Sequence, residues 1–444
     1  MTARRVCLDA LLQVEENEGY SNIVLDKALR AASLDPRDSA LASTLFYGVL
    51  EKELTLDYVI SQFLKNPRQK LELGTAMLLR MAVYQILYLD RIPDSAAVNE
   101  AVSLAKETGR GRYAGLINAV LRHFLREQNK LVWPDEKADL YAAYSVKYAI
   151  PQPLIRLWDQ AYGRERLELL LKALSTRASL YVRVNTLKIT DEALCRQLES
   201  EGCAVSVCSF VPHALKIDRL PGKLTDLPSF ADGLFHVQDT ASQLLCTLAD
   251  PKPGTTVADV CAAPGGKSFT LAEMMENTGN LLSFDLYKGR VGLIRDGAQR
   301  LGIVNLTAAV RDASNAKDTF LADTVLCDVP CSGFGVIRRK PEIRRKKPAD
   351  AAGLPAIQSA ILENAAAHVL PGGRLIYSTC TLNPAENNRV AECFLVSHPE
   401  FEPEPILLEH TLDEPAYMLT MLPGVLDTDG FFAARFRRRL EDPR

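Results

Sequence analysis

Six short apolar segments, which alternate with helical segments from about residue 236 onward, constrain the fold most strongly. Apolar and β-branched residues fill these segments, and stretches with helical spacing or Gly-rich turns separate them. Strands that alternate with helices form a doubly wound parallel sheet, because the crossover helices cover the two faces of that sheet. The sequence therefore predicts an α/β Rossmann-like domain with strands at 256–260, 281–285, 306–310, 324–328, 374–379 and 430–436.

The preceding residues predict a different architecture. Val6, Ala10 and Val14 recur at helical spacing, and Asp35-Pro36 has the residue types of a helix start. A chain of 444 residues has room for two to three domains of ordinary size. We expect a multi-domain protein with an all-α bundle at 1–130, a linker at 131–153, a small α+β unit at 154–235 and the α/β domain at 236–444.

Composition excludes several classes of protein. Charged residues make up 24% of the chain and the net charge is −3, which excludes a disordered chain and a uniformly basic nucleic-acid coat. The chain has neither an apolar run of membrane-spanning length nor a signal peptide, so we expect a cytoplasmic protein with no membrane partner. The ten cysteines form no C-x-x-C motif, which favours reduced thiols and no metal.

The first motif follows the first predicted strand. Small residues let a backbone approach a ligand closely, and the helix start after them offers free N–H groups; this loop consists of Cys261, Ala262, Ala263, Pro264, Gly265, Gly266 and Lys267. Asp285 ends the second strand, where an acid can accept both ribose hydroxyls of a nucleoside, and Asp312 follows the third. The alternatives are a tight turn without ligand and a phosphate-binding P-loop, for which Cys261 stands where glycine is needed.

Two further motifs carry thiols. Cys331 and Cys380 follow the fourth and fifth strands, where open α/β sheets bind their ligands. One chemistry suits two thiols, an acid and a nucleoside cofactor: a thiolate adds to carbon 6 of a pyrimidine, and carbon 5 then attacks an electrophilic methyl group. Asp328 is the candidate acid that protonates the ring. The residues do not decide which thiol attacks, and an inert buried cysteine is the alternative for either one alone.

A basic strip follows the second motif and consists of Arg338, Arg339, Lys340, Arg344, Arg345, Lys346 and Lys347. Such a run is usually a solvated face, but beside a base-modifying site we expect it to follow RNA phosphates.

The thiol motifs, together with Cys261–Lys267, the segment 383–387, the segment 183–188 and the segment 430–435, resemble the Sun (Fmu) family of RNA cytosine-5 methyltransferases. The helical region resembles the NusB fold, a fusion that implies an enzyme acting on bacterial small-subunit (16S) rRNA. The resemblance covers essentially the whole chain.

This resemblance implies roles that the residues alone leave open. Cys380 would be the nucleophile, Cys331 would assist product release, and Asp328 would lie near both the target base and the cofactor. S-adenosylmethionine would contact Asp328, Asp285, Asp312 and the loop Cys261–Lys267. The substrate would be 16S rRNA before full subunit assembly, bound by a monomer, with the bundle and the α+β unit also binding RNA. The alternative function is a non-catalytic RNA-binding or antitermination-like factor, against which both thiol motifs argue.

Overall fold

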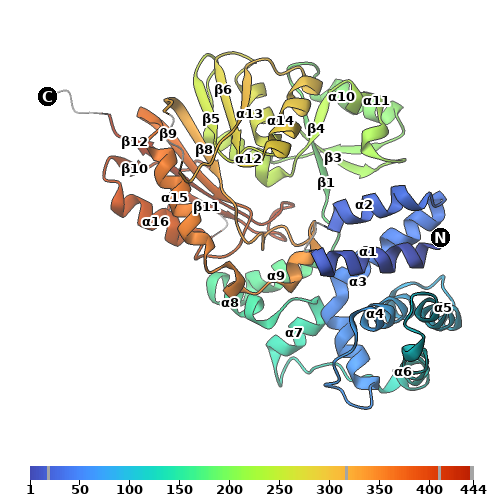
Figure 1. Cartoon of the computed structure of the whole chain (residues 1–444). Coiled ribbons are helices and arrows are strands. Elements are labelled where there is room, and N and C mark those ends of the chain that lie inside the picture. Colours follow the sequence, from blue (N-terminus) through green and yellow to red (C-terminus); the bar gives the residue numbers. More distant parts are fainter. Residues whose placement is uncertain (18–20, 316–318, 409–411, 441–444) are drawn as a thin grey trace. The chain divides into compact units, whose positions relative to one another are not determined.

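The computed structural model describes residues 1–17, 21–315, 319–408 and 412–440, and the chain forms two compact units (Figure 1). The first unit contains Met1–Gln160 together with Ile337–Pro348, and the second contains Ala161–Val336 and Ala349–Arg444. A short segment from the C-terminal half of the chain therefore belongs to the N-terminal unit.

The first unit is helical throughout. Asp35 caps its longest helix as expected, because the carboxylate accepts a 2.8 Å hydrogen bond from the amide of Asp38 and Pro36 opens the helix. The α-helices are α1 (Ala3–Asn17), α2 (Ser21–Ala32), α3 (Pro36–Phe63), α4 (Leu73–Tyr88), α5 (Asp94–Glu107), α6 (Ala114–Glu127), α7 (Leu140–Tyr148) and α8 (Gln152–Tyr162), whose last two residues lie in the second unit. Short 3₁₀ turns occupy Gly111–Tyr113, Gln128–Lys130 and Pro341–Arg345.

One apolar core holds this unit together. Leu8, Phe46, Leu78 and Phe124, from α1, α3, α4 and α6, are buried in a single cluster. Helix α4 is apolar on most sides because helices α1, α3, α5 and α6 all pack against it. Burial of such side chains stabilises a bundle by about 1.5–3 kcal/mol for each one.

The second unit begins with a small antiparallel sheet of four strands in the order β2-β3-β1-β4. Apolar side chains of α10, including Leu194 and Leu198, pack in one cluster with Val182 and Val184 of β1. The elements are α9 (Arg164–Leu174), β1 (Leu180–Val184), α10 (Asp191–Ser200), β2 (Ala204–Val207), β3 (Ala214–Arg219), a 3₁₀ turn (Leu224–Asp226), α11 (Pro228–Ala231) and β4 (Phe235–Val237).

A larger sheet follows, with the order β10-β12-β9-β8-β5-β6-β7 and β11 paired to β12. Strands β9, β8, β5, β6 and β7 run parallel, whereas β12 is antiparallel to β9, β10 and β11. The strands are β5 (Thr256–Asp259), β6 (Asn280–Asp285), β7 (Leu306–Val310), β8 (Ala322–Asp328), β9 (Val369–Thr379), β10 (Phe401–Pro403), β11 (Met418–Met421) and β12 (Phe431–Arg438).

Helices cover both faces of this sheet (Figure 1). Alternate strand residues point to opposite faces: Val257 and Leu326 pack with α12, α13 and α14, whereas Ala258 and Val325 pack with α15 and α16. The helices are α12 (Thr240–Ala249), α13 (Gly266–Met274), α14 (Lys288–Leu301), α15 (Leu354–Ala366) and α16 (Asn388–Ser397), and a 3₁₀ turn spans Pro348–Ala351.

The predicted fold class is confirmed: a helical bundle, a small α+β unit and a Rossmann-like domain follow one another along the chain. Two details differ from the expectation. Helix α7 lies inside the predicted linker 131–153, where Asp139 caps it by accepting from the amide of Ala142. The segment Ile337–Pro348 packs with the bundle although it falls inside the predicted domain 236–444. Across the described ranges, no helix is long and apolar enough to cross a membrane.

Candidate active site

The carboxyl ends of the parallel strands bring the predicted motifs to one edge of the large sheet. Asp328 at the end of β8 pairs in register with Ser378 of β9, and Asp285 at the end of β6 pairs with Val310 of β7. The loops that carry both thiols therefore leave neighbouring strands, as the sequence predicts. Open α/β sheets bind ligands at this edge.

The loop between β5 and α13 is held tightly against the sheet. The amide of Ala262 donates a 2.7 Å hydrogen bond to the carbonyl of Phe284, and that of Gly265 donates to Ala262. Gly265 has φ of +114°, and a Cβ there would lie 2.4 Å from the ring of Phe269. Only glycine both adopts this positive φ and leaves room for the Phe269 ring. Because the turn carries no side chain, its backbone and the start of α13 are open to a ligand.

Asp259, the last residue of β5, is a buried carboxyl group beneath this loop. One carboxylate oxygen accepts a 2.8 Å hydrogen bond from the hydroxyl of Ser268, which in turn accepts from Ser283. Burial raises the pKa of Asp259 to about 7, since the charged form loses its hydration. This carboxyl therefore changes charge close to neutral pH.

Asp285 and Asp312 lie at the ends of the next two strands but differ in exposure. Asp285 is buried, accepts from the amide of Tyr287, and lies 3.3 Å from a guanidinium nitrogen of Arg290. Arg290 also donates to the carbonyl of Ala263, so it links Asp285 to the glycine-containing loop. Asp312 is exposed, and its carboxylate accepts from the amide and hydroxyl of Ser314, which lowers its pKa.

Lys267 and Asp328 form an ion pair that the sequence did not indicate. The Lys267 Nζ atom lies 2.6 Å from Oδ2 of Asp328 and 5.4 Å from the ring centre of Phe431. Burial alone would lower the pKa of Lys267, but the charge of Asp328 outweighs it and raises that pKa. The other Asp328 oxygen accepts a 3.1 Å hydrogen bond from Ser378. Asp328 is therefore held on both sides, between the loop Cys261–Lys267 and β9.

The two candidate thiols meet at this edge. The Sγ atoms of Cys331 and Cys380 lie 3.2 Å apart, and both side chains are partly accessible. The hydrogen bond with Cys380, followed by burial, raises the pKa of Cys331 well above its ordinary value. The two sulfurs share this hydrogen bond, in which either thiol can be the donor. Among the described residues, Cys331 and Cys380 are the pair of cysteines whose sulfurs lie within hydrogen-bonding distance.

Residues with no predicted role also contribute to the site. Glu386 is fully buried between the two thiol loops and accepts hydrogen bonds from Ser332, Gln358 and Asn383. Gly335 lies against the backbone of Cys380, to which its amide donates. The only available signal for Glu386 was its place in the motif at 383–387, because the residues that it joins lie on three separate segments.

The basic strip is divided between burial and exposure. Arg344 is 7% exposed and donates to the carbonyls of Tyr148 and Ala149, the first of which ends α7. Arg345 forms ion pairs of 2.5 Å with Glu15 and 2.6 Å with Glu53. Neither geometry suits a contact with RNA phosphate, so these two residues hold their own segment against the bundle. Lys340, Lys346 and Lys347 are exposed, whereas Arg338 and Arg339 are half-buried.

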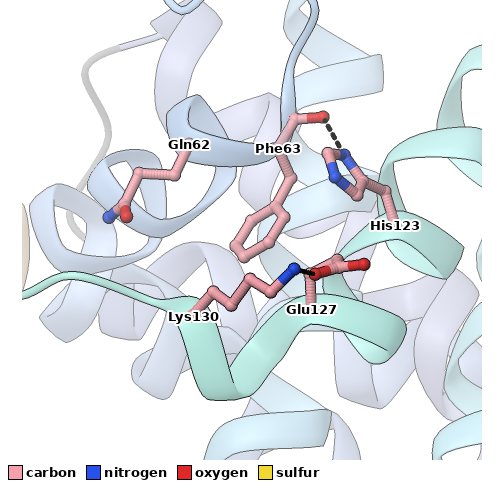
Figure 2. Close-up of a pocket in the computed structure, with 5 residues that line it drawn as sticks. All are labelled: Gln62, Phe63, His123, Glu127 and Lys130. Carbon is pink, nitrogen blue, oxygen red and sulfur yellow. Dashed lines mark hydrogen bonds and ion pairs between the residues drawn. The ribbon is translucent and has the colours of Figure 1, made fainter.

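A surface pocket of the first unit lies away from these motifs in the chain (Figure 2). Its lining residues are Gln62, Phe63, His123, Glu127 and Lys130. Lys130 forms a 2.5 Å ion pair with Glu127, and Nδ1 of His123 lies 3.2 Å from the carbonyl oxygen of Phe63. Its charged side chains are therefore engaged with other groups of the same unit.

Comparison with known proteins relates three segments of the chain to protein families. The model for the 16S rRNA methyltransferase RsmB/F family matches residues 246–437, that of the NusB family matches 1–126, and that of the RsmF/B-like ferredoxin-like domain matches 150–221. Two relatives named "Probable ribosomal RNA small subunit methyltransferase B" match almost end to end. The protein from Bacillus subtilis (strain 168) is 38% identical over 99% of both chains, and that from Synechocystis sp. (strain ATCC 27184 / PCC 6803 / Kazusa) is 34% identical over 99% of this chain and all of its own.

The chain belongs to the RsmB/F family of 16S rRNA methyltransferases. The chain is also similar to the crystal structure of PH0851, with a TM-score of 0.83 and 28% identity over 98% of each chain. The predicted resemblance is therefore confirmed, and so are the enzyme class and its methyl donor, S-adenosylmethionine. The small α+β unit is the ferredoxin-like domain of this family.

The edge of the large sheet fits this cofactor. The start of α13 and the Gly265 turn present backbone groups at this edge, and the buried carboxylate of Asp285 has the chemistry to accept from ribose hydroxyls. Among the residues described, no group of His, Cys, Asp and Glu side chains could hold a metal ion.

Proposed function

We propose that this protein transfers a methyl group from S-adenosylmethionine to carbon 5 of a cytosine in 16S rRNA through a covalent adduct with Cys380. The observation that carries the proposal is the 3.2 Å distance between the sulfurs of Cys380 and Cys331 beside the Asp328–Lys267 ion pair. Carbon 5 of cytosine is a poor nucleophile, and simple binding of RNA needs no paired thiols.

The geometry supports a division of labour between the thiols. The thiolate of Cys380 adds to carbon 6, which makes the ring an enamine whose carbon 5 attacks the methyl group. The bound cofactor supplies that electrophilic methyl group. The proton on carbon 5 then passes to solvent water, its bonding electrons re-form the C5–C6 double bond, the C6–S bond breaks, and Cys380 leaves as a thiolate that can accept a hydrogen bond from the thiol of Cys331. Cys331, whose pKa is raised by its hydrogen bond with Cys380 and by burial, remains a proton carrier beside the adduct and assists this release.

Asp328 supports the addition from the other side of the site. The acid lies two residues before Pro330 and three before Cys331, and its carboxylate is fixed by Lys267 and Ser378. We propose that it delivers a proton to the ring nitrogen of the target base as the thiolate adds, and that it would also help to hold the cofactor. The loop Cys261–Lys267, Asp285 and Asp312 would hold the cofactor.

The substrate proposal extends to the rest of the chain. We propose that the monomer acts in the cytoplasm on 16S rRNA before the subunit is fully assembled, because the target base must be unstacked to expose both ring faces. The NusB-like unit and the ferredoxin-like domain would contact the RNA. The exposed lysines of the basic strip would follow its phosphates, supported by Arg338 and Arg339.

The deciding experiment is incubation of the protein with S-adenosylmethionine and unmodified 16S rRNA, followed by bisulfite sequencing. We expect one newly protected cytosine with the wild-type protein and none with Cys380→Ala, while calorimetry shows unchanged cofactor binding. Cys393→Ala is the matched control, since this cysteine is exposed on α16 and should leave methylation unchanged. Full methylation by Cys380→Ala would overturn the assignment of the nucleophile. Cofactor binding without any protected cytosine would overturn the proposed target atom.

A further inference from the structure

A buried acid and its neighbour, Glu386 and Asn387, connect the two thiol loops. Both side chains are almost inaccessible, with exposures of 0% and 1%. Burial of a carboxylate is costly unless hydrogen bonds replace its water. Glu386 accepts four such bonds, and all four come from neutral donors.

The Glu386 carboxylate holds the chain on one side of Cys331 and acts through Gln358 on the other. Oε2 accepts 2.9 Å hydrogen bonds from the amide of Ser332 and from Nε2 of Gln358, and Oε1 accepts one of 2.6 Å from the Ser332 hydroxyl. Gln358, on α15, also donates 3.0 Å to the carbonyl of Pro330. Both neighbours of Cys331 are therefore fixed by the same small network.

Asn387 fixes the two chain neighbours of Cys380. Its Oδ1 accepts a 2.6 Å hydrogen bond from the hydroxyl of Thr379, and its Nδ2 donates 2.9 Å to the carbonyl of Thr381. Thr379 and Thr381 are the two neighbours of Cys380. The network is closed between the loops, because the hydroxyls of Ser332 and Thr381 lie 2.7 Å apart.

We propose that Glu386 and Asn387 are positioning residues that hold Cys331 and Cys380 at hydrogen-bonding distance. Neither touches the reacting atoms. Each fixes both chain neighbours of one thiol, and the peptide bond between them couples the two halves. Hydrogen bonds to an ionised acceptor are stronger than those between neutral groups, so the carboxylate is the part of this network that an amide cannot replace. This inference rests on the proposed roles of the two thiols.

The test uses Glu386→Gln in the full chain, with Glu392→Gln as the matched control because that acid is exposed on α16. Glutamine keeps the shape of the side chain but places an NH₂ group against the donors from Ser332 or Gln358. We expect kcat for methyl transfer to fall by at least about tenfold with KM for S-adenosylmethionine within about twofold of the wild-type value. The control should retain both parameters.

A second readout reports the thiol geometry without substrate. Diamide oxidises two adjacent thiols to a disulfide, with loss of two hydrogens that the reagent takes up as its hydrazine, and mass spectrometry of the peptide pair measures the rate. We expect the Cys331–Cys380 disulfide to form more slowly in Glu386→Gln by a factor similar to the loss in kcat. Because this readout needs neither RNA nor methyl transfer, it tests the positioning even if the proposed target atom is wrong.

A lower kcat together with an unchanged rate of disulfide formation would overturn the proposal, as would wild-type behaviour in both assays. Ser332→Ala serves if Glu386→Gln does not fold. It removes the hydroxyl that bridges Glu386 and Thr381 but keeps the backbone donor. We expect a smaller fall in kcat and a smaller fall in the rate of disulfide formation. Wild-type values of both would count equally against the proposal.

Discussion

The backbone amide of Gly335 donates a 3.0 Å hydrogen bond to the carbonyl oxygen of Cys380. The loop that carries Cys331 is thus fastened to the backbone of the other thiol as it leaves the site. The carbonyl of Gly335 accepts from the amide of Gly430, which precedes β12. Gly335 therefore connects the loop that carries Cys331 with the residue that follows β9 and the residue that precedes β12.

Gly335→Ala tests this close approach. A Cβ at this position would lie 1.9 Å from the carbonyl oxygen of Gly430 and 2.8 Å from that of Cys380, and both are backbone atoms that cannot rotate away. We expect methyl transfer to fall at least about tenfold while cofactor binding, measured by calorimetry, persists. Gly353→Ala is the control, because a Cβ there meets no atom within 4 Å. Equal activity of the two variants would show that the close approach does not matter for catalysis.

Cys331→Ala tests the release step. Without the thiol that carries a proton beside the adduct, addition and methylation should outrun expulsion of Cys380. We expect a protein–RNA adduct that survives denaturing gel electrophoresis in Cys331→Ala but not in wild type. The double variant with Cys380→Ala should form none. The absence of a shifted band under turnover conditions would contradict the proposed role of Cys331.

The strand ends of the catalytic domain were predictable because its inner parallel strands are buried on both faces. An apolar run that stops at an acid, as at Asp285 and Asp328, marks both the strand and the functional edge. The structure places β7 at the predicted residues 306–310, and β8 ends at Asp328 as expected. Each of these features depends on residues that are close in the sequence.

Long-range partners were not predictable in this way. The basic strip was expected to follow RNA phosphates, and the ion pairs of Arg345 were not foreseen because Glu15 and Glu53 lie about 300 residues earlier in the chain. Helix α7 was missed because the breaker Trp133-Pro134 precedes it and only Asp139 marks its start. The place of Glu386 in the motif at 383–387 was its only signal, since two of its donors, Ser332 and Gln358, lie on other segments of the chain.

The protonation of Asp259 should make stability depend on pH. Its pKa is about 7 in the folded protein and about 4 in an unfolded chain, so between these values the folded state binds an additional proton. Raising the pH through this window therefore favours unfolding, by at most about 4 kcal/mol. We expect Asp259→Asn to flatten the fall in stability between pH 4 and about 7, as measured by chemical denaturation. Asp218→Asn, at an exposed position, is the control, and parallel profiles for Asp259→Asn and wild type would contradict the prediction.

Arg345 should stabilise the N-terminal unit through its two ion pairs. Arg345→Ala removes the cation that contacts both Glu15 and Glu53, although Arg80 still pairs with Glu53 at 3.0 Å, and we expect the free energy of unfolding to fall by about 1–2 kcal/mol. Both tryptophans of the chain, Trp133 and Trp158, lie in this unit, so their fluorescence follows its unfolding in urea. Lys346→Ala, at an exposed position, should change stability by less than about 0.5 kcal/mol.

A double-mutant cycle with Glu53→Ala completes this test. Residues in one ion-pair network couple, so the second substitution should cost less when the first is already present. Additive losses would show that Arg345 acts through packing of its side chain and not through its charge.

The exposed lysines of the strip should bind RNA electrostatically, whereas Arg344 should not. Lys346 and Lys347 lie at the surface, and replacing both with alanine should reduce the slope of log affinity against log salt concentration by about 0.7 for each phosphate that is no longer neutralised. Burial lowers the pKa of Arg344, which donates to backbone carbonyls, so its replacement should destabilise the first unit and leave the slope unchanged. Filter binding of 16S rRNA fragments over a range of salt concentrations measures the slope, and tryptophan fluorescence measures the stability. If Lys346→Ala with Lys347→Ala leaves the slope at its wild-type value, the strip is a solvated face that also anchors its own segment, and the phosphates are bound elsewhere on the chain.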